Sequence, residues 1–413
     1  MKFFDLNNDK FRQIIVDKEE GQFLGQVSSA MLEDGQTIIA VYPKCHGRGS
    51  IVEKISYDGG LSWSERINLP ESFVTSMDVP TVFRTVDKNG QKRLLLFTGT
   101  YPIRMAVSED DGLSWSELQP IGNYGGMCVM GDMVYLGTPG KYMALFHDEV
   151  NSFFGGDESE LHSFYRFQSG SKKKYVYFIH ERLEDGSIGA QKRKFFADGD
   201  ADCPEENGEK IYEIAYGQMD KGTQFHVNKI ITTDGGLTWS QPQTIARHKD
   251  AHLCEPGCIW LKNGSLAILI RENMVKYNSF IMFSHDNGET FTEPRQIPRC
   301  LTGDRHTCRR LPDGRIAITF RDKIEDFGTL GDWILWIGTD EDLLNGTDGQ
   351  YRFRLKYNYP NAGDWKCDCA YSGFHVLKDG TMVLITYGHW DEGEPAYILE
   401  VRFNLSEWEK ENH

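Results

Sequence analysis

Apolar segments along the chain occur in pairs, and each pair is joined by a short polar turn of Asp-Gly or Asn-Gly. Such dipeptides between apolar runs are strong signals for β-hairpins. The turns begin at Asp34, Asn89, Asn263, Asp313 and Asp379. The flanks of four of them align, with an apolar residue two positions before each turn. The pattern therefore predicts a chain built from repeated antiparallel strand pairs.

A second repeat occurs along the same chain. It has the form Ser/Thr-x-Asp-x-Gly-x-Ser/Thr-aromatic. Its four copies are Ser56–Trp63, Ser108–Trp115, Thr232–Trp239 and Ser284–Phe291. The aspartates are 52 residues apart within each pair, from 58 to 110 and from 234 to 286. A period near ~50 residues in a strand-rich chain predicts a propeller with one repeat per blade.

The octets are interpreted as structural turns. An aspartate can accept hydrogen bonds from the backbone of its own turn, and glycine adopts backbone conformations that other residues resist. The aromatic residue is expected to fold back between neighbouring strands. We therefore do not expect the octet aspartates to be catalytic.

These repeats predict an all-β fold, a six-bladed β-propeller of four-stranded antiparallel blades, as one domain over residues 1–413. The early strand at 11–16 is expected to complete the last blade, which removes an exposed sheet edge. A polar excursion at 149–222 belongs to the third blade and leaves room for a seventh. The predicted blades cover 24–72, 76–120, the region from 123, 250–300, 301–358 and 365–405.

Charge and composition disfavour several classes of function. The formal net charge of −16 opposes non-specific binding to nucleic acid or anionic membranes. No apolar run approaches the length of a membrane span, and the N-terminus lacks a signal-peptide core. The nine cysteines show no secreted-scaffold spacing, so free thiols in the cytoplasm are expected. A zinc site formed by the pairs 254/258 and 367/369 is disfavoured because the second pair is too tight.

The turn register locates the candidate site. In a propeller, the innermost strand starts at one face of the central channel and the second strand returns to it. Large polar residues stand eight positions before four of the turns: Gln26, Glu255, Arg305 and Tyr371. Others stand eight positions after them: Tyr42, Arg271, Arg321 and Tyr387. The register predicts a ring of polar side chains around one mouth of the channel.

Two segments give this site a resemblance. Glu255-Pro256, followed by 261–266 and Arg271, looks like the Glu-Pro … Leu-x-Asp/Asn-Gly-x-Leu … Arg segment of the sialidase (neuraminidase) superfamily. Tyr371-Ser372 before 376–381 looks like its Tyr-Ser … Leu-x-Asp-Gly-Thr segment. The octets resemble that superfamily's Asp boxes (BNR repeats). The resemblance implies that Tyr371 is a nucleophile, that Glu255 activates it, and that Arg271 holds a substrate carboxylate.

The chemistry agrees with those residue types. A phenol has a pKa near ~10 and needs a base nearby to attack. A neutral tyrosine also approaches an anionic sugar without the repulsion that a carboxylate nucleophile meets, and sialidases are the tyrosine exception among glycosidases. Arginine grips a carboxylate bidentately, which favours a carboxylated sugar.

The chain departs from the family at two positions, so it is expected to be an atypical member. Gln26 stands where the family has the first arginine of its carboxylate-binding triad. His46 stands about where the family has an acidic general acid, and histidine is competent for that role. Arg48 is a substitute anion clamp, Arg321 a candidate third arginine, and Arg305 has no counterpart in typical sialidases.

Any of the arginines can instead pair with a carboxylate such as Glu255, Asp304 or Asp368, and at least one is expected to do so. The leading hypothesis is an exo-glycosidase of sialidase type acting on an acidic sugar, without metal or cofactor. One alternative is a propeller polysaccharide lyase that cleaves uronic-acid glycosides by Tyr/His β-elimination. Another is a carbohydrate-binding propeller without catalysis.

Overall fold

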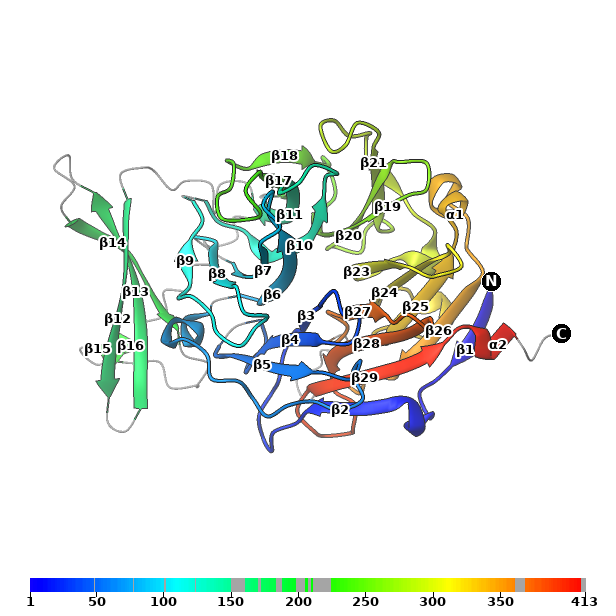
Figure 1. Ribbon diagram of the computed structural model, residues 1–413, viewed down its shortest axis with the longest axis horizontal. Helices are drawn as coiled ribbons and strands as arrows, with labels where there is room; N and C mark the ends of the chain where they lie inside the picture. The colour runs from blue at the N-terminus through cyan, green and yellow to red at the C-terminus, as the bar shows by residue number, and fades with distance from the viewer. Residues whose placement is uncertain are drawn as a thin grey trace.

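The computed structural model describes residues 1–47, 49–76, 78–99, 102–122, 124–149, 224–360 and 368–409, together with the strands β12 to β16 between 160 and 210. Six β-sheets stand in a ring, and the predicted six-bladed propeller is confirmed (Figure 1). No helix in the described part of the chain is long and apolar enough to span a membrane.

The first three blades follow the order of the chain, and each consists of antiparallel neighbours. Blade I contains β3 (Ser28–Met31), β4 (Ile38–Pro43) and β5 (Ile51–Ser56). Blade II contains β6 (Thr81–Val86), β7 (Lys92–Thr98), β8 (Arg104–Ser108) and β9 (Gln119–Pro120). Blade III contains β10 (Met127–Tyr135), β11 (Tyr142–Glu149), β17 (Phe225–Thr232) and β18 (Gln243–Ala246).

The remaining blades include both strands from the N-terminus. Blade IV contains β19 (Leu253–Trp260), β20 (Leu266–Glu272), β21 (Phe280–Ser284) and β22 (Arg295–Gln296). Blade V contains β23 (Gly303–Arg310), β24 (Ile316–Asp322), β25 (Trp333–Gly338) and β26 (Tyr351–Lys356), with β1 (Lys2–Asp5) added in parallel. Blade VI contains β27 (Gly373–Val376), β28 (Thr381–Gly388), β29 (Tyr397–Asn404) and β2 (Gln13–Asp17).

The N-terminal strand β2 closes the ring as the sequence predicts, because it pairs with β29 as the outer strand of blade VI. The predicted Asp-Gly and Asn-Gly turns also lie where expected, between the first and second strands of five blades. Among the described residues, four short 3₁₀ helices and one α-helix connect the strands: η1 (Lys10–Arg12), η2 (Glu71–Thr75), η3 (Arg299–Leu301), η4 (Glu325–Phe327) and α1 (Asp340–Asn345). A second α-helix, α2 (Ser406–Glu409), follows β29.

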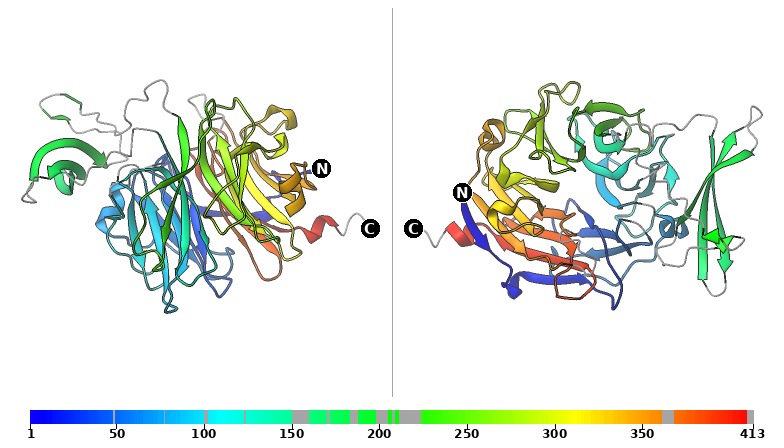
Figure 2. Two further views of the ribbon diagram at one scale, coloured as in Figure 1. Left: turned by 90° about the horizontal axis from the view of Figure 1, so that it is seen from above. Right: turned by 180° about the vertical axis from the view of Figure 1, so that it is seen from behind.

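Between β11 and β17 of blade III, the described part of the chain contains five further strands, which form two separate sheets. They are β12 (Glu160–Ser169), β13 (Lys172–Arg182), β14 (Ile188–Ala197), β15 (Glu205–Glu206) and β16 (Glu209–Lys210). The sheet β12-β13-β14 lies at one side of the ring and approaches η2 (Figures 1 and 2). The other residues of the predicted 149–222 excursion lie outside the described part of the chain.

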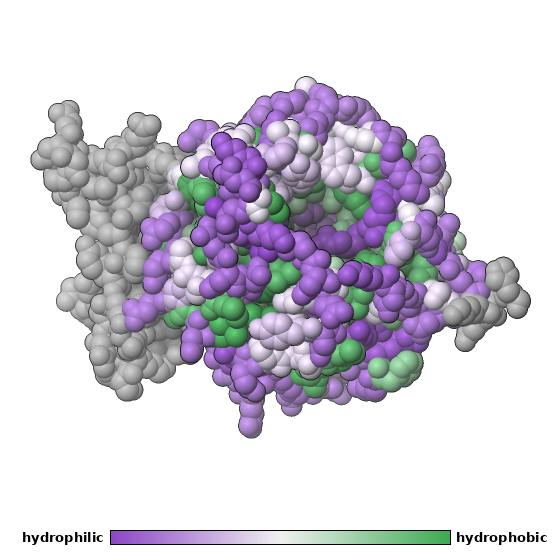
Figure 3. Space-filling view, viewed as in Figure 1, coloured by the Kyte–Doolittle hydropathy of each residue, from purple (hydrophilic) through white to green (hydrophobic). Residues whose placement is uncertain are grey.

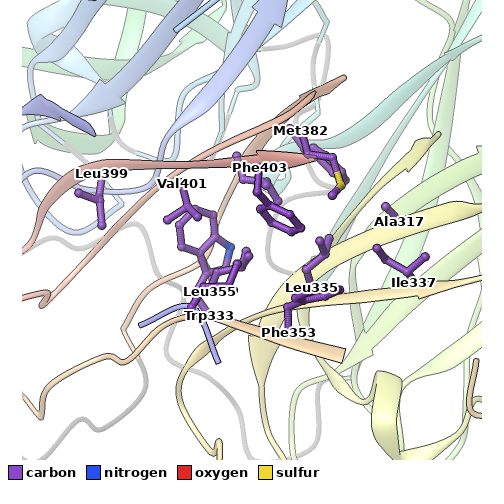
Figure 4. Packing of buried hydrophobic residues seen from close by; sticks show 14 of the residues in the cluster. Ala317, Trp333, Leu335, Ile337, Phe353, Leu355, Met382, Leu399, Val401 and Phe403 are labelled. Carbon is purple, nitrogen blue, oxygen red and sulfur yellow. The ribbon is translucent and has the colours of Figure 1, made fainter. Parts of the chain in front are cut away.

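Apolar side chains fill the spaces between adjacent blades, because the faces of each sheet meet the faces of its neighbours. Between blades V and VI, Trp333, Leu335 and Phe353 pack against Leu399 and neighbouring strand residues, and all four are almost fully buried (Figure 4). At about 25 cal/mol per Å² of buried apolar surface, such interfaces supply most of the stabilisation of the ring. They hold the inner strands at fixed positions around the channel.

Each octet forms the same local turn at the end of the third strand of its blade. In the second copy, Asp110 Oδ1 accepts the Ser114 backbone N–H at 2.9 Å, and Oδ2 accepts the Ser114 hydroxyl at 2.5 Å. Gly112 has φ +91°, in the left-handed region that favours glycine. A side chain on Gly112 would also meet Oε1 of Glu53, since a Cβ there would lie 2.7 Å from that oxygen.

The octets also connect each blade to the preceding one. Trp115 Nε1 donates to Glu53 of blade I at 2.7 Å, and Trp63 Nε1 donates to Glu400 of blade VI at 3.2 Å. The fourth octet ends in Phe291, which has no indole N–H. The residue of the preceding blade that contacts its ring is Lys229 of blade III. Its Nζ lies 5.2 Å from the centroid of the phenyl ring, a cation–π contact. The third octet differs, since Trp239 Nε1 donates to the Gly236 oxygen of its own turn at 3.0 Å, and its ring meets Phe97 of blade II edge-on with centroids 5.7 Å apart.

Candidate active site

Side chains from four blades converge at one mouth of the channel, and Tyr371 and Glu255 are at their centre. The Tyr371 hydroxyl donates a hydrogen bond to Glu255 Oε1. Arg271 Nη1 lies 2.7 Å from the same carboxylate oxygen and 3.2 Å from the Tyr371 hydroxyl oxygen. These residues come from blades VI and IV, and only ring closure brings them together. The predicted Tyr–Glu–Arg group is therefore assembled.

Local backbone geometry aims these side chains. Glu255, Arg305 and Ala370 have positive φ values of 46°, 56° and 66°, although none is glycine. The pairing register shifts within β19–β20 and β23–β24 at the positions of Glu255 and Arg305. A bulge of this kind re-aims a side chain, and strained residues of this kind typically cost about 1–3 kcal/mol each. Positive φ thus occurs at the register position in two blades and one residue before it in a third.

Ionisation of the central pair follows from its surroundings. Burial, the largest single effect, would raise the pKa of Glu255, but Arg271, His147 and Arg305 together leave that pKa below its ordinary value. Burial and the adjacent Glu255 charge raise the pKa of Tyr371 well above 10.0. The pair is thus a neutral phenol donating to a carboxylate. Glu255 Oε2 is buried and has no hydrogen-bond partner among the described residues.

The arginines of the predicted ring are engaged with protein acceptors. Asp304 bridges two of them, with Oδ1 at 2.8 Å from Arg271 Nε and Oδ2 at 2.6 Å from Arg321 Nη2. Although burial opposes it, these cations hold the pKa of Asp304 well below its ordinary value. The expectation that at least one arginine pairs with a carboxylate is confirmed for both.

Arg305 lies beneath the tyrosine ring. Its guanidinium carbon is 5.5 Å from the centroid of the Tyr371 ring, and that of Arg321 is 5.7 Å from it. Arg305 also donates to the backbone oxygens of Cys128 and Met130 at 3.0 and 2.9 Å. Three arginines therefore surround Tyr371, where a negative charge on its oxygen would be stabilised.

A second polar cluster lies beside the first. Gln26 Nε2 is 3.2 Å from the Tyr387 hydroxyl and 3.3 Å from His46 Nε2. His46 Nδ1 is 3.1 Å from Asp368 Oδ1, and Tyr387 donates to the same oxygen at 2.6 Å. The ring centroids of Tyr387 and Tyr371 are 6.3 Å apart, so the two clusters are adjacent.

One residue of the sequence-based ring does not join these clusters in the structure. Tyr42 is fully buried, and its hydroxyl donates to Asp17 at 2.6 Å, so it belongs to the packing of blades I and VI. Arg48 lies outside the described residues. In the described part of the chain, no group of three or more His, Cys, Asp or Glu residues is placed to hold a metal ion.

Sequence reasoning missed several neighbours of the site. Asp78, at the start of blade II, accepts the Cys128 N–H at 2.5 Å, and burial raises the pKa of Asp78 to about 7. The Cys128 sulfur is 3.8 Å from Glu255 Oε1. His147 Nδ1 accepts the Glu255 N–H at 3.3 Å, and burial lowers the pKa of His147 to about 3, which keeps it neutral. None of them falls on the turn register that located the other residues.

The site adjoins open space. Tyr371 and Arg305 line a cavity of about 280 Å³ in the channel, together with Ser29, Thr81 and Asp132 from three other blades. Hydrophilic residues dominate the face shown in Figure 3, around a hollow near the centre of the ring. The channel therefore offers a polar, concave setting next to the Tyr–Glu pair.

Comparison with known proteins supports the fold. No family model matches the chain, and no curated protein matches it in sequence. A protein of unknown function from Dyadobacter fermentans has a similar structure, with 13% identity and a TM-score of 0.58 over 95% of this chain and 97% of that one.

Two glycosidases are also similar in structure. The α-L-arabinanase of Penicillium chrysogenum, complexed with arabinobiose, has 12% identity and a TM-score of 0.53 over 96% of this chain and 98% of the arabinanase. The Hadza microbial sialidase Hz136 has 14% identity and a TM-score of 0.51 over 93% of this chain and 66% of the sialidase. At this identity, the similarity establishes a shared propeller fold.

Proposed function

We propose that the protein is a retaining exo-glycoside hydrolase of sialidase type that removes a terminal sugar bearing a carboxylate. The observation that carries the proposal is the hydrogen bond from Tyr371 to Glu255, with Arg271 in contact with both. Glycosidases among the proteins of similar structure support a carbohydrate substrate. The resemblance to sialidase motifs and Asp boxes supports the finer assignment.

In the first step, the Tyr371 oxygen attacks the anomeric carbon while its proton passes to Glu255. The glycosidic bond breaks, and His46, which enters the step as an imidazolium, gives its Nε2 proton to the departing oxygen. Arg271 keeps Glu255 ionised before the attack and lies beside the phenol oxygen as it loses its proton. Preorganised charge of this kind acts strongly where water is excluded.

In the second step, water attacks the anomeric carbon of the tyrosyl glycoside intermediate, and His46 takes the proton of that water. The bond to Tyr371 breaks, and Glu255 returns the proton to the phenol oxygen. Each group ends in its starting state. Two displacements at one carbon retain the anomeric configuration.

The charge balance supports an anionic sugar. Three arginines and a lysine outnumber the carboxylates of the site; the cations are Arg271, Arg305, Arg321 and Lys323, and the carboxylates are Glu255, Asp304 and Asp368. The site therefore keeps a net positive charge, which favours an anionic sugar. Gln26 supplies a hydroxyl or carboxylate contact in place of an arginine.

The test is release of a fluorescent aglycone from sialic-acid and uronic-acid glycosides by wild type and Tyr371→Phe. We expect turnover of an acidic glycoside that the substitution reduces by at least about 10³-fold, since the nucleophile is lost. Turnover that survives the substitution would refute the assignment of Tyr371. An unsaturated uronate as product would instead establish a lyase.

A further inference from the structure

His46 is set apart from the other residues of the site by its exposure and by its partner. Its side chain is 63% exposed, in the loop that follows β4, whereas the Asp368 side chain beside it is only 9% exposed. His46 Nδ1 is 3.1 Å from Asp368 Oδ1 and 3.2 Å from Oδ2. The exposed imidazole of His46 thus contacts the buried Asp368 carboxylate through Nδ1.

Asp368 is held in place and ionised. The Tyr387 hydroxyl donates to its Oδ1 at 2.6 Å. Burial alone would raise the pKa of Asp368, but hydrogen bonds from His46 and Tyr387 and the charge of Arg321 leave that pKa below its ordinary value. A buried, charged acceptor that also receives the Tyr387 hydroxyl therefore faces Nδ1 of His46.

The loop of His46 is tied to the same network. Gln26 Oε1 accepts the Gly47 N–H at 2.7 Å, and Gln26 Nε2 lies 3.3 Å from His46 Nε2. The same Gln26 nitrogen lies 3.2 Å from His46 Nδ1, so it does not distinguish the two ring nitrogens. The choice of tautomer rests on Asp368, whose carboxylate can only accept and therefore favours a proton on Nδ1.

We propose that Asp368 is a positioning residue: it holds a proton on Nδ1 of His46 throughout the reaction, so that Nε2 is the nitrogen that gives a proton to the glycosidic oxygen and takes one from water. The proposal rests on the function proposed above, in which His46 is the acid/base. Which ring nitrogen is protonated is set by the hydrogen bond that the other one makes. Because Tyr387 contacts both Asp368 and the ring of Tyr371, the dyad stands next to the nucleophile.

A comparison of leaving groups tests the proposal. Phenol needs a proton as it departs, and 4-nitrophenol needs little help, so kcat/KM is measured for phenyl and 4-nitrophenyl sialosides. General acid catalysis contributes about 10²–10⁴-fold. We expect Asp368→Asn to lower kcat/KM about 100-fold for the phenyl sialoside and less than about 5-fold for the 4-nitrophenyl sialoside.

A carboxylate that pairs with a single cation at the surface gives the control. Asp326 pairs with Arg299 through side chains that are both about half exposed, and Asp326→Asn is expected to leave both values unchanged. An equal loss on both substrates in Asp368→Asn, or no loss on either, would overturn the role assigned to Asp368, because a merely structural defect does not distinguish leaving groups.

The tautomer is measured independently of turnover. With ¹⁵N-labelled histidine, the His46 signals, assigned by their loss in His46→Gln, should show a protonated Nδ1 and an unprotonated Nε2 in the neutral ring. Asp368→Asn should remove that preference. The opposite tautomer in wild type, or an unchanged one in the variant, would refute the inference. If wild type cleaves neither sialoside while the tautomer behaves as expected, the proposed reaction fails and the dyad stands.

Discussion

Replacing Glu53 by Gln should make the propeller more stable at alkaline pH. Glu53 is fully buried between blades I and II, and its Oε2 accepts the indole N–H of Trp115 at 2.7 Å. Its Oε1 is buried with no hydrogen-bond partner among the described residues. Burial raises the pKa of Glu53 from 4.5 to about 8, with a small opposing effect from Trp115. The folded protein therefore keeps this carboxyl protonated at neutral pH.

The direction of the pH effect follows from this raised pKa. The stability that Glu53 contributes is fully present below pH 4.5 and is lost as the pH rises to about 8, because only the unfolded chain releases the proton over that range. Each pKa unit corresponds to about 1.36 kcal/mol, so the interval from 4.5 to about 8 gives at most about 5 kcal/mol. Glutamine has similar size, accepts from Trp115 and cannot ionise.

The assay is urea unfolding of wild type and Glu53→Gln at pH 5, 6, 7 and 8. We expect similar free energies of unfolding at pH 5 and an advantage of about 2–4 kcal/mol for the variant at pH 8. The exposed Glu65, in the same blade, provides the control Glu65→Gln, for which wild-type behaviour is expected. A difference between wild type and Glu53→Gln that stays constant from pH 5 to 8 would refute the reasoning.

Two further predictions concern the octets and the site. Gly112→Ala should destabilise the fold by about 3 kcal/mol or more, since its Cβ would lie 2.7 Å from Glu53 Oε1. The control Gly137→Ala, also at positive φ but with no described atom within 4 Å, should cost only about 1 kcal/mol. Equal losses of stability in the two variants, measured by thermal unfolding, would contradict this prediction. Arg271→Lys should lower kcat/KM for the hydrolysed sialoside at least about 100-fold, because lysine has no planar fork to contact two carboxylates at once, while Arg299→Lys serves as the control. Near-normal turnover in Arg271→Lys would show that the bridge is dispensable.

Short stretches of the sequence were sufficient to predict the paired strands and turns of the blades. A hairpin turn such as Asp313-Gly314 depends on a few neighbouring residues, so its position follows directly from the sequence. The closure of blade VI by β2 was also predictable, because the early strand has no other partner in a closed ring. Glu255 and Tyr371 were found because both stand at one offset from their turns.

Other features depend on contacts between distant residues. His46 and Asp368 are 322 positions apart and share no motif, so their pairing is visible only in the folded ring. The bulge at Arg305 puts a residue other than glycine at positive φ, a conformation that its side-chain type does not signal. Tyr42 fits the turn register but is turned toward Asp17, because the apolar surroundings between blades I and VI accept its ring.

Identification of the residue that becomes covalently attached to the sugar tests the central claim most directly. Wild type is incubated with a sialosyl fluoride carrying a second fluorine next to the anomeric carbon, which slows the second step, and is then digested and analysed by mass spectrometry. The account predicts one sugar adduct, on Tyr371, that is absent from Tyr371→Phe. An adduct on another residue, or hydrolysis of the sialoside with inversion and without any adduct, would contradict it.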